Sequence, residues 1–335
     1  MKVAAFGRTH WLLNSILALS ERGNEIVLVG TCPAAPEYKA AERNFEELAR
    51  ELSCPFFCDA NINRPSYIQM ARESGAEAAI SVNWIGLIGQ KMLDVFEHGL
   101  LNAHAGDLPR YRGNACPNWA ILNGEEEVVL TIHQMSVDLD AGPVVLKREF
   151  SLTEETYIAD VYRFVESNIP EMFGEALAGL ANGSLSPVPQ SDAAEDSLRC
   201  FPRLPRDGEM DWTKSAADLA RLVRASAEPF AGAYSFLDDE KVIVWRARSG
   251  RLPYPYLSVP GQVVHRDEKS GEVSVATGEG ILVLQESENA EGRGRAADIV
   301  RTMRARFGTD AGEDVGPREE TRRAGGQPST IGVTR

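Results

Sequence analysis

Short apolar runs alternate with amphipathic segments through the first hundred residues. The apolar runs are short enough to be buried strands, and they lie at 2–6, 25–30, 77–83 and 100–104. The amphipathic segments predict helices, several of which end at a glycine, and they lie at 10–22, 39–52, 65–75 and 90–98. This alternation predicts an α/β domain built on a Rossmann-like, mostly parallel sheet with helices on both faces.

Two further strands and a long helix are predicted to complete this domain. The strands are expected at 128–135 and 143–150. Apolar residues then recur at spacings of three and four, which is typical of a helix that buries one face. We expect this helix to begin after Thr153 as N-cap, to kink at Pro170 and to end at Gly183.

The second half of the chain has a different pattern. Residues 184–207 are rich in Pro, Ser and Asp without periodicity, which predicts an extended linker. A helix near 215–225 is followed by five short strand candidates, which indicate a small, OB-like β-barrel; they lie at 233–237, 241–247, 261–265, 272–277 and 280–286. The predicted units are a catalytic domain at 1–187, a linker at 188–207, a barrel at 208–307 and a disordered tail at 308–335.

Composition and charge narrow the classes of function. The chain has 335 residues, 43% hydrophobic and 25% charged, which suits two globular domains and excludes a collagen-like or wholly disordered chain. Its formal charge is −14, with a balance of −13 over residues 1–200 and −1 over residues 201–310. Such a surface repels phosphate, so nucleic-acid binding is not expected.

The five cysteines include no CxxC pair and no zinc-site spacing, so we expect free thiols and no metal. No stretch reaches the ~20 apolar residues of a membrane span, and the beginning of the chain lacks the features of a signal peptide. These observations predict a cytoplasmic protein without a membrane partner.

The first strand-to-helix loop excludes a dinucleotide site. Only Gly7 stands there, so the GxGxxG phosphate cradle is missing. The second strand ends in Gly30-Thr31 rather than in an acidic residue, and the chain has no GxxxxGK[ST] phosphate loop. An NAD-dependent oxidoreductase is therefore not expected.

The densest group of chemically unusual residues follows the strand at 100–104. Asn102 and His104 are two apart on that strand, so their side chains share one face. Ligands bind outside the carboxyl ends of strands in open α/β sheets. Asp138 or Asp140, in the loop between the two later strands, could orient the imidazole.

An amide that binds an oxyanion, a histidine that moves a proton and a supporting carboxylate together suit acyl transfer. The chain lacks a GxSxG nucleophile elbow, so the substrate itself would attack. Each residue also has a structural interpretation: a core histidine, an amide that caps a turn, and a solvated aspartate. The residues alone leave both interpretations open.

The same region resembles the 10-formyltetrahydrofolate-dependent formyltransferases, which include enzymes acting on methionyl-tRNA, glycinamide ribonucleotide and amino sugars. The resemblance lies in NAH at 102–104, LPRYRG at 108–113, PNWAILNG at 117–124, TIHQM at 131–135 and DAG at 140–142. A weaker likeness continues through FPR at 201–203, DGEMDW at 207–212 and Arg224.

The resemblance implies 10-formyltetrahydrofolate as cosubstrate, no metal, and Asn102, His104 and Asp140 as the catalytic residues. It implies a folate pocket lined by Val82, Asn83, Trp84, Ile85, Gly86, Leu87 and Ile88 and closed by Asp138, Leu139, Ala141 and Gly142. Gly106-Asp107 stand where relatives usually have Ser-Leu, which puts an extra carboxylate beside the site. We consider His10, Asp107 and Arg112 as candidates for binding the acceptor.

Charge then bears on which amine accepts the formyl group. Relatives that act on tRNA have a basic second domain and a basic insertion after the second strand, whereas residues 32–42 here carry no such basic loop. We therefore expect a small amine, such as a nucleotide-linked amino sugar or an amino-acid-derived siderophore precursor. Methionyl-tRNA formylation, hydrolysis of the formylfolate, and a non-catalytic folate-binding module are the alternatives, and a homodimer is possible.

Overall fold

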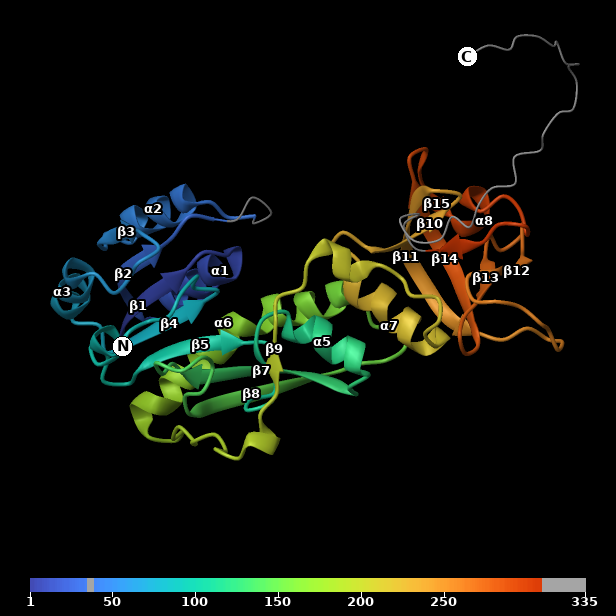
Figure 1. Ribbon diagram of the computed structural model, residues 1–335. Helices are drawn as coiled ribbons and strands as arrows, with labels where there is room; N and C mark the ends of the chain where they lie inside the picture. The colour runs from blue at the N-terminus through green and yellow to red at the C-terminus, as the bar shows by residue number, and fades with distance from the viewer. Residues whose placement is uncertain (35–38, 309–335) are drawn as a thin grey trace, which may run out of the picture.

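A computed structural model describes residues 1–34 and 39–308. It confirms the predicted fold class, with a mostly parallel α/β sheet in the first half and an antiparallel barrel-like sheet in the second (Figure 1). The tail predicted to be disordered lies outside the described residues, apart from Gly308, which ends a strand. The limits of the predicted domains stay predictions.

The first sheet has the strand order β3-β2-β1-β4-β5-β7-β8. Its first five strands in this order are parallel, and β7 and β8 run antiparallel to their neighbours. The strands are β1 (Lys2–Gly7), β2 (Glu25–Thr31), β3 (Phe56–Cys58), β4 (Ala78–Val82), β5 (Leu100–His104), β7 (Glu127–Gln134) and β8 (Val144–Ser151).

Helices cover both faces of this sheet, which is why its central strands are apolar throughout instead of alternating. Val3 and Ala5 pack with α1, α2, α5 and α6, whereas Ala4 and Phe6 pack with α3 and α4 on the opposite face. The helices are α1 (His10–Glu21), α2 (Glu42–Glu51), α3 (Pro65–Ser74), α4 (Gln90–Leu93), α5 (Cys116–Asn123) and α6 (Ile158–Asn182).

The start of the long helix α6 differs from the prediction. The helix begins at Ile158, four residues later than an N-cap at Thr153 requires. Thr153 and Thr156 instead close a turn on each other, with Thr153 N donating to Thr156 Oγ1 at 2.9 Å and Thr156 N donating to the Thr153 carbonyl at 3.1 Å. This hydroxyl-to-backbone bonding competes with helix formation. The helix ends at Asn182 with Gly183 as its left-handed C-cap, as expected, and it contains Pro170; the predicted kink there stays a prediction.

The linker is more structured than its composition suggested. Arg199–Cys200 forms the short strand β9, which pairs in parallel with β6 (Arg112–Gly113), next to the predicted site. Two 3₁₀ turns, Ala194–Asp196 and Pro205–Gly208, flank this pairing. Sequence periodicity could not reveal it, because the pairing joins residues about ninety positions apart.

The second sheet has the order β12-β13-β14-β11-β10-β16, with β15 paired to β14, and all its pairs are antiparallel. Backbone bonds close it into a barrel: Phe307 N donates to the Gly261 carbonyl at 2.8 Å, and Val263 N to the Ala305 carbonyl at 3.3 Å. The elements are α7 (Ala216–Ser226), β10 (Ala233–Leu237), β11 (Glu240–Gly250), β12 (Val263–Arg266), β13 (Val273–Ala276), β14 (Ile281–Asn289), β15 (Gly292–Arg295), α8 (Ala296–Ile299) and β16 (Phe307–Gly308).

Helix α7 lies between the two sheets and packs against α5 (Figure 1). Arg224, near its end, is buried and donates from Nη1 to the carbonyls of Thr153 and Thr156, at 2.7 and 3.1 Å. The turn before α6 is therefore tied to α7 by one charged side chain.

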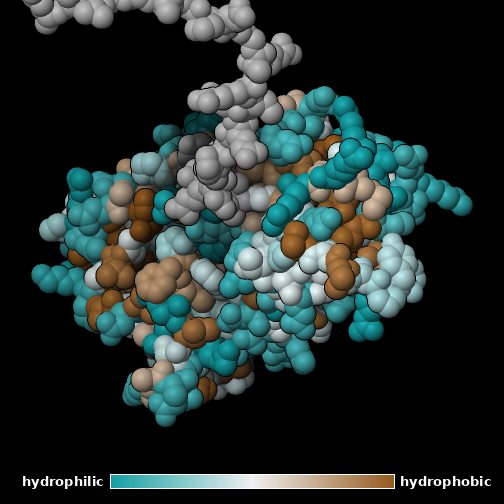
Figure 2. Space-filling view, turned by 45° about the vertical axis from the view of Figure 1, so that its right-hand side comes forward, coloured by the Kyte–Doolittle hydropathy of each residue, from teal (hydrophilic) through white to brown (hydrophobic). Residues whose placement is uncertain are grey.

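Hydrophilic residues cover much of the face shown in Figure 2, and hydrophobic residues form separate groups on it. Within the described residues, no helix combines the length and the apolar character that crossing a membrane requires.

We expect Arg224→Met to lower the free energy of unfolding by about 2 kcal/mol, because it leaves two carbonyls, one of them buried, without their charged donor. Urea unfolding measures the effect. Arg43→Met, on the exposed side of α2, is the matched control and should change stability by less than about 0.5 kcal/mol. Equal losses of stability in the two variants would show that Arg224 does not tie the turn before α6 to α7.

Candidate active site

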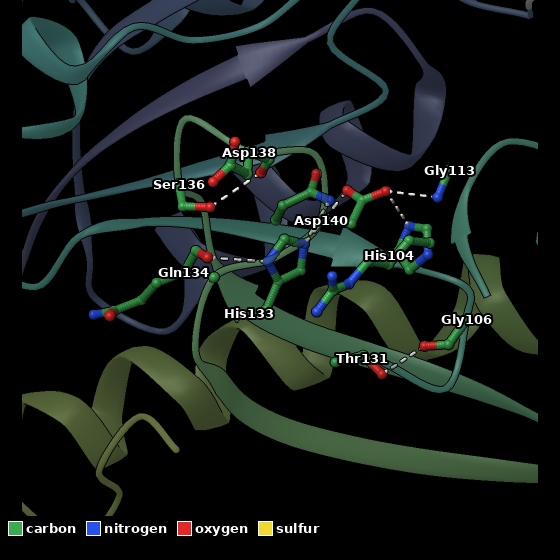
Figure 3. Close-up of polar contacts among 12 residues, drawn as sticks. His104, Gly106, Gly113, Thr131, His133, Gln134, Ser136, Asp138 and Asp140 are labelled. Carbon is green, nitrogen blue, oxygen red and sulfur yellow. Dashed lines mark hydrogen bonds and ion pairs between the residues drawn. The ribbon is translucent and has the colours of Figure 1, made fainter. Parts of the chain in front are cut away.

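A cavity of about 270 Å³ opens at the carboxyl ends of β4 and β5. Its walls are the turn after β4, the loop at 136–140 after β7, and the start of α5, with Trp11 and Tyr162 at one side. This is the edge at which parallel sheets bind ligands. Asn102, His104 and Asp140 all line the cavity, so the structure brings the three predicted catalytic residues together. Figure 3 shows His104 and Asp140 facing each other.

A second histidine, His133 on β7, holds the amide of Asn102. The Asn102 side-chain Nδ2 lies 3.1 Å from His133 Nε2, and His133 Nδ1 lies 3.0 Å from the Gln134 carbonyl. A carbonyl only accepts, so Nδ1 carries the proton and Nε2 accepts from the amide. This hydrogen bond fixes one N–H of Asn102 and therefore the orientation of its amide in the cavity.

His133 is held in its neutral form. It is only 1% exposed, and burial, reinforced by the nearby His104, lowers its pKa from 6.5 to about 4. Asp140 opposes the shift, but its Oδ1 is 3.8 Å from His133 Nε2, beyond hydrogen-bond distance.

His104 is held differently. Its Nε2 is 2.6 Å from the Tyr111 carbonyl, so Nε2 carries a proton. Its Nδ1 faces Asp140 Oδ2 at 3.7 Å and is the nitrogen left for proton transfer.

The close approach of Tyr111 to His104 depends on Gly106. A Cβ at position 106 would lie 2.3 Å from the Tyr111 oxygen and 2.6 Å from His104 Nε2, closer than any such contact allows. Thr131 Oγ1 fixes this glycine by donating to its carbonyl at 2.7 Å (Figure 3). The glycine at this position therefore leaves room for the contact that fixes His104.

Asp140 is positioned by its backbone and by its neighbours. It adopts a left-handed conformation, with φ of 50°, and its Oδ2 accepts from Gly113 N at 2.8 Å. Gln190 Nε2, from the linker, donates to the carbonyls of Asp140 and Gly142 at 2.8 and 2.7 Å. Arg112 in turn donates to Gln190 Oε1 at 2.6 and 3.1 Å, so this arginine braces the loop.

Most of the predicted folate pocket lines the cavity, namely Val82, Asn83, Trp84, Gly86, Leu87, Ile88, Asp138 and Leu139. Ile85, Ala141 and Gly142 are not among its lining residues in the described part of the chain. Gly142 instead lies against the Gln134 carbonyl, where a Cβ would come within 1.8 Å.

The three candidates for acceptor binding do not line this cavity in the regions that the structure describes. His10 Nε2 pairs with Glu166 at 3.2 Å. Asp107 pairs with Lys147 Nζ at 2.5 Å and borders a separate small cavity. Arg112 supports Gln190, as described above. None of them is beside Asn102 and His104 as a free charged group.

Two buried cysteines lie behind His104. Cys116 Sγ is 3.7 Å from His104 Nε2. A hydrogen bond with Cys200, together with burial, raises the pKa of Cys116, while the same bond lowers the pKa of Cys200. The Cys116 thiol therefore stays protonated and contributes packing. Among the described residues, no group of three or more His, Cys, Asp or Glu could hold a metal.

Sequence reasoning did not assign roles to His133, to the Tyr111 carbonyl or to Gln190. His133 lies within the TIHQM block that carried the resemblance, so a signal for it existed. The carbonyl and the linker glutamine left no signal, because their roles come from contacts made in the folded chain.

Comparisons with known proteins identify the family of both halves of the chain. Residues 1–177 match the family model described as formyl transferase, and residues 204–303 match that of the formyl transferase C-terminal domain. HypX from Aquifex aeolicus, solved with tetrahydrofolic acid, is 20% identical with a TM-score of 0.58, and the match covers 90% of this chain. This chain spans about half of HypX, at 47% of its length.

Two sugar-modifying enzymes are similar over nearly their whole length. The Helicobacter canadensis N-formyltransferase, solved with folinic acid and dTDP-3-aminofucose, is 14% identical with a TM-score of 0.63, and the match covers 85% of this chain and 98% of that one. WlaRD, a sugar 3N-formyl transferase solved with dTDP and 5-N-formyl-THF, has the same identity and TM-score, with 87% and 98% covered. At this identity, the likeness shows the fold.

The neutral state of His133 predicts a pH-dependent stability. Between pH 6.5 and about 4 the unfolded chain binds a proton at His133 that the folded protein does not. The free energy of unfolding should therefore fall as the pH drops through this window, by on the order of 3 kcal/mol from this residue. His133→Gln keeps an acceptor for Asn102 but does not titrate, so urea unfolding at several pH values should show a shallower loss. Identical pH profiles would contradict a neutral, buried His133.

Proposed function

The chain belongs to the formyl transferase family, and we propose that it transfers the formyl group of 10-formyltetrahydrofolate to a primary amine of a small molecule. The observation that carries this proposal is the convergence of Asn102, His104 and Asp140 on one cavity, with each side chain held by a second contact. The folates bound in the similar structures support the choice of cosubstrate.

The cavity supports folate binding by its shape and lining. The turn at 83–88 offers backbone groups along one wall, and Trp84 lines the cavity while its ring packs edge-on against Phe6, with centroids 6.4 Å apart. Asp138 and Leu139 lie on the other wall. A flat ring system between two such walls is how a pterin would be held, with the formyl group toward Asn102 and His104.

The proposed reaction is direct transfer. The neutral amine attacks the formyl carbon, a new N–C bond forms, and the carbonyl oxygen becomes an oxyanion. The Asn102 N–H that does not bond His133, together with the proton on His104 Nδ1, stabilises this oxyanion. The bond from carbon to N10 of the folate then breaks, and the proton lost by the amine goes to N10 through His104.

Asp140 supports this cycle as a positioning group. Its carboxylate faces His104 Nδ1 at 3.7 Å and helps to orient the ring. This separation is longer than a hydrogen bond, so the proton on Nδ1 stays available to the reacting atoms.

The charge distribution favours a small acceptor. The second half of the chain has a balance of −1 and no basic surface expected to hold a polyanion. The sugar N-formyltransferases named above match this chain over 98% of their length. We therefore place a nucleotide-linked amino sugar first and an amino-acid-derived metabolite of the siderophore-precursor type second.

The decisive experiment incubates the protein with 10-formyltetrahydrofolate and, separately, amino-sugar nucleotides, hydroxyornithine and charged initiator tRNA. We expect tetrahydrofolate release that depends on a small amine, together with a formylated product detected by mass spectrometry. Formylation of the tRNA alone would overturn the small-amine proposal. Release of folate without any amine would indicate a hydrolase, and tight folate binding without turnover would indicate a binding module.

We expect Asn102→Ala to reduce kcat by about 10²–10³-fold, because it removes an oxyanion donor, and His104→Ala to abolish turnover. Circular dichroism should show both variants folded. His265→Ala, at an exposed histidine of β12, is the matched control and should keep full activity. Retained turnover in His104→Ala would rule out the proposed proton transfer.

A further inference from the structure

A second, smaller cavity adjoins the candidate active site. Its volume is about 100 Å³, and Ala115 lines both cavities. Its other walls come from the linker at 203–205, from Ser226 at the end of α7 and from the loop at 230–232. Tyr162 of the larger cavity contacts Phe230 of the smaller one, with ring centroids 5.8 Å apart. The two cavities therefore lie side by side at the junction of the two halves of the chain.

Arg203 gives this cavity a positive charge that no carboxylate neutralises by contact. Its Nη2 donates to the Asp207 backbone carbonyl at 2.8 Å and to Ser226 Oγ at 3.3 Å. None of the ion pairs formed within residues 1–34 and 39–308 includes Arg203. The Asp207 carboxylate accepts from Leu204 N instead, at 2.7 Å.

The surroundings of Arg203 make an anionic partner favourable. The guanidinium lies 5.9 Å from the centre of the Trp119 ring and is half-buried. Burial lowers the pKa of Arg203, which means that its charge is poorly solvated. A partly desolvated guanidinium binds carboxylate and phosphate oxygens more strongly than an exposed one does.

Asn118 provides the second, independent observation. It is 2% exposed, and its Nδ2 donates to the Ala225 carbonyl at 2.8 Å, which fixes the orientation of the amide. Its Oδ1 is buried and accepts no hydrogen bond in the described structure. Asn118 lines the same cavity as Arg203. Buried acceptors are nearly always satisfied, so this oxygen indicates a missing donor.

We propose that this cavity is an anion subsite for the acceptor: Arg203 binds a carboxylate or phosphate group of the amine substrate, and Asn118 Oδ1 accepts from a hydroxyl or N–H next to that group. The inference deepens the proposed function and rests on it. It narrows the substrate class to amines that carry an oxyanion, with a hydrogen-bond donor beside it.

The size and lining of the cavity agree with this occupant. A volume of about 100 Å³ has room for an oxyanion and the group next to it. Leu204 and Phe230 supply apolar walls for adjoining carbon atoms. Because the chain has a formal charge of −14, an anionic acceptor requires a local cation such as Arg203.

The first experiment measures anion binding without folate or transfer. The purified full-length protein is titrated with inorganic phosphate, observed by ³¹P NMR line broadening, and separately with ¹³C-acetate, at constant ionic strength set by chloride. We expect saturable broadening with at least one of the two anions. Saturation with only phosphate, or with only acetate, would show which group the subsite prefers.

Arg203→Met should weaken that binding at least tenfold, and Arg203→Lys should restore part of it. The matched control is Arg206→Met, which removes the same charge from an exposed position three residues away and should bind like the wild type. Absence of saturable binding to either anion, or equal losses in Arg203→Met and Arg206→Met, would overturn the proposal.

Kinetics supply the second measurement once the panel above yields an acceptor. Arg203→Met should raise the acceptor KM at least tenfold, while kcat and the KM for 10-formyltetrahydrofolate change less than about threefold. An unchanged acceptor KM would overturn the subsite. Because the NMR measurement needs no transfer, failure of the formyl-transfer proposal and failure of the anion subsite give different results.

Discussion

Two histidines from adjacent strands and one backbone N–H from the loop before α5 converge on the carboxylate of Asp140. Gly113 N donates to Oδ2 at 2.8 Å, His104 Nδ1 faces the same oxygen at 3.7 Å, and His133 Nε2 faces Oδ1 at 3.8 Å. The carboxylate has little access to water, so its charge is felt strongly by both imidazoles. The orientation of the loop and the position of the cavity wall depend on it.

The two histidines have opposite tasks because their surroundings differ. His133 is enclosed and neutral, so it can accept from Asn102 and orient an amide without adding charge. His104 lies between a carbonyl and a carboxylate, which both favour N–H groups. In the proposed reaction, one residue fixes a donor and the other moves a proton, and this division of roles comes from the environment, since the two side chains are identical.

The second half of the chain is connected to this chemistry through the linker. Strand β9 pairs with β6, which contains Gly113, and Gln190 donates to the carbonyls of Asp140 and Gly142. Arg203, a few residues on, faces the smaller cavity. A segment whose composition predicts only a flexible connection therefore supports the catalytic loop and supplies the charge that we assign to acceptor binding.

Much of the fold follows from the sequence. Strands β1, β2, β4 and β5 are apolar because both faces of the sheet are covered, and this local pattern gave their positions to within one or two residues. The pattern did not predict strand β3, because three residues carry too little periodicity. It did not predict helix α5 either, because this short helix has a proline in its first turn and also carries too little periodicity. At α6, side-chain bonding between Thr153 and Thr156 overrode a good N-cap signal.

In the candidate site, too, some features could be predicted from the sequence and others depend on the tertiary structure. The sequence by itself predicted which side chains carry chemistry: Asn102 and His104 share a strand face by the two-residue period, and the family resemblance selected Asp140 over Asp138 in the loop that returns to the same edge. Only the tertiary structure decided how they are held, because the Tyr111 carbonyl, His133, Gln190 and the Arg203–Asn118 pair act through contacts between distant segments. Periodicity records which face a residue buries, but hydrogen-bond partners and local dielectric exist only after the strands, the linker and the second domain have packed together.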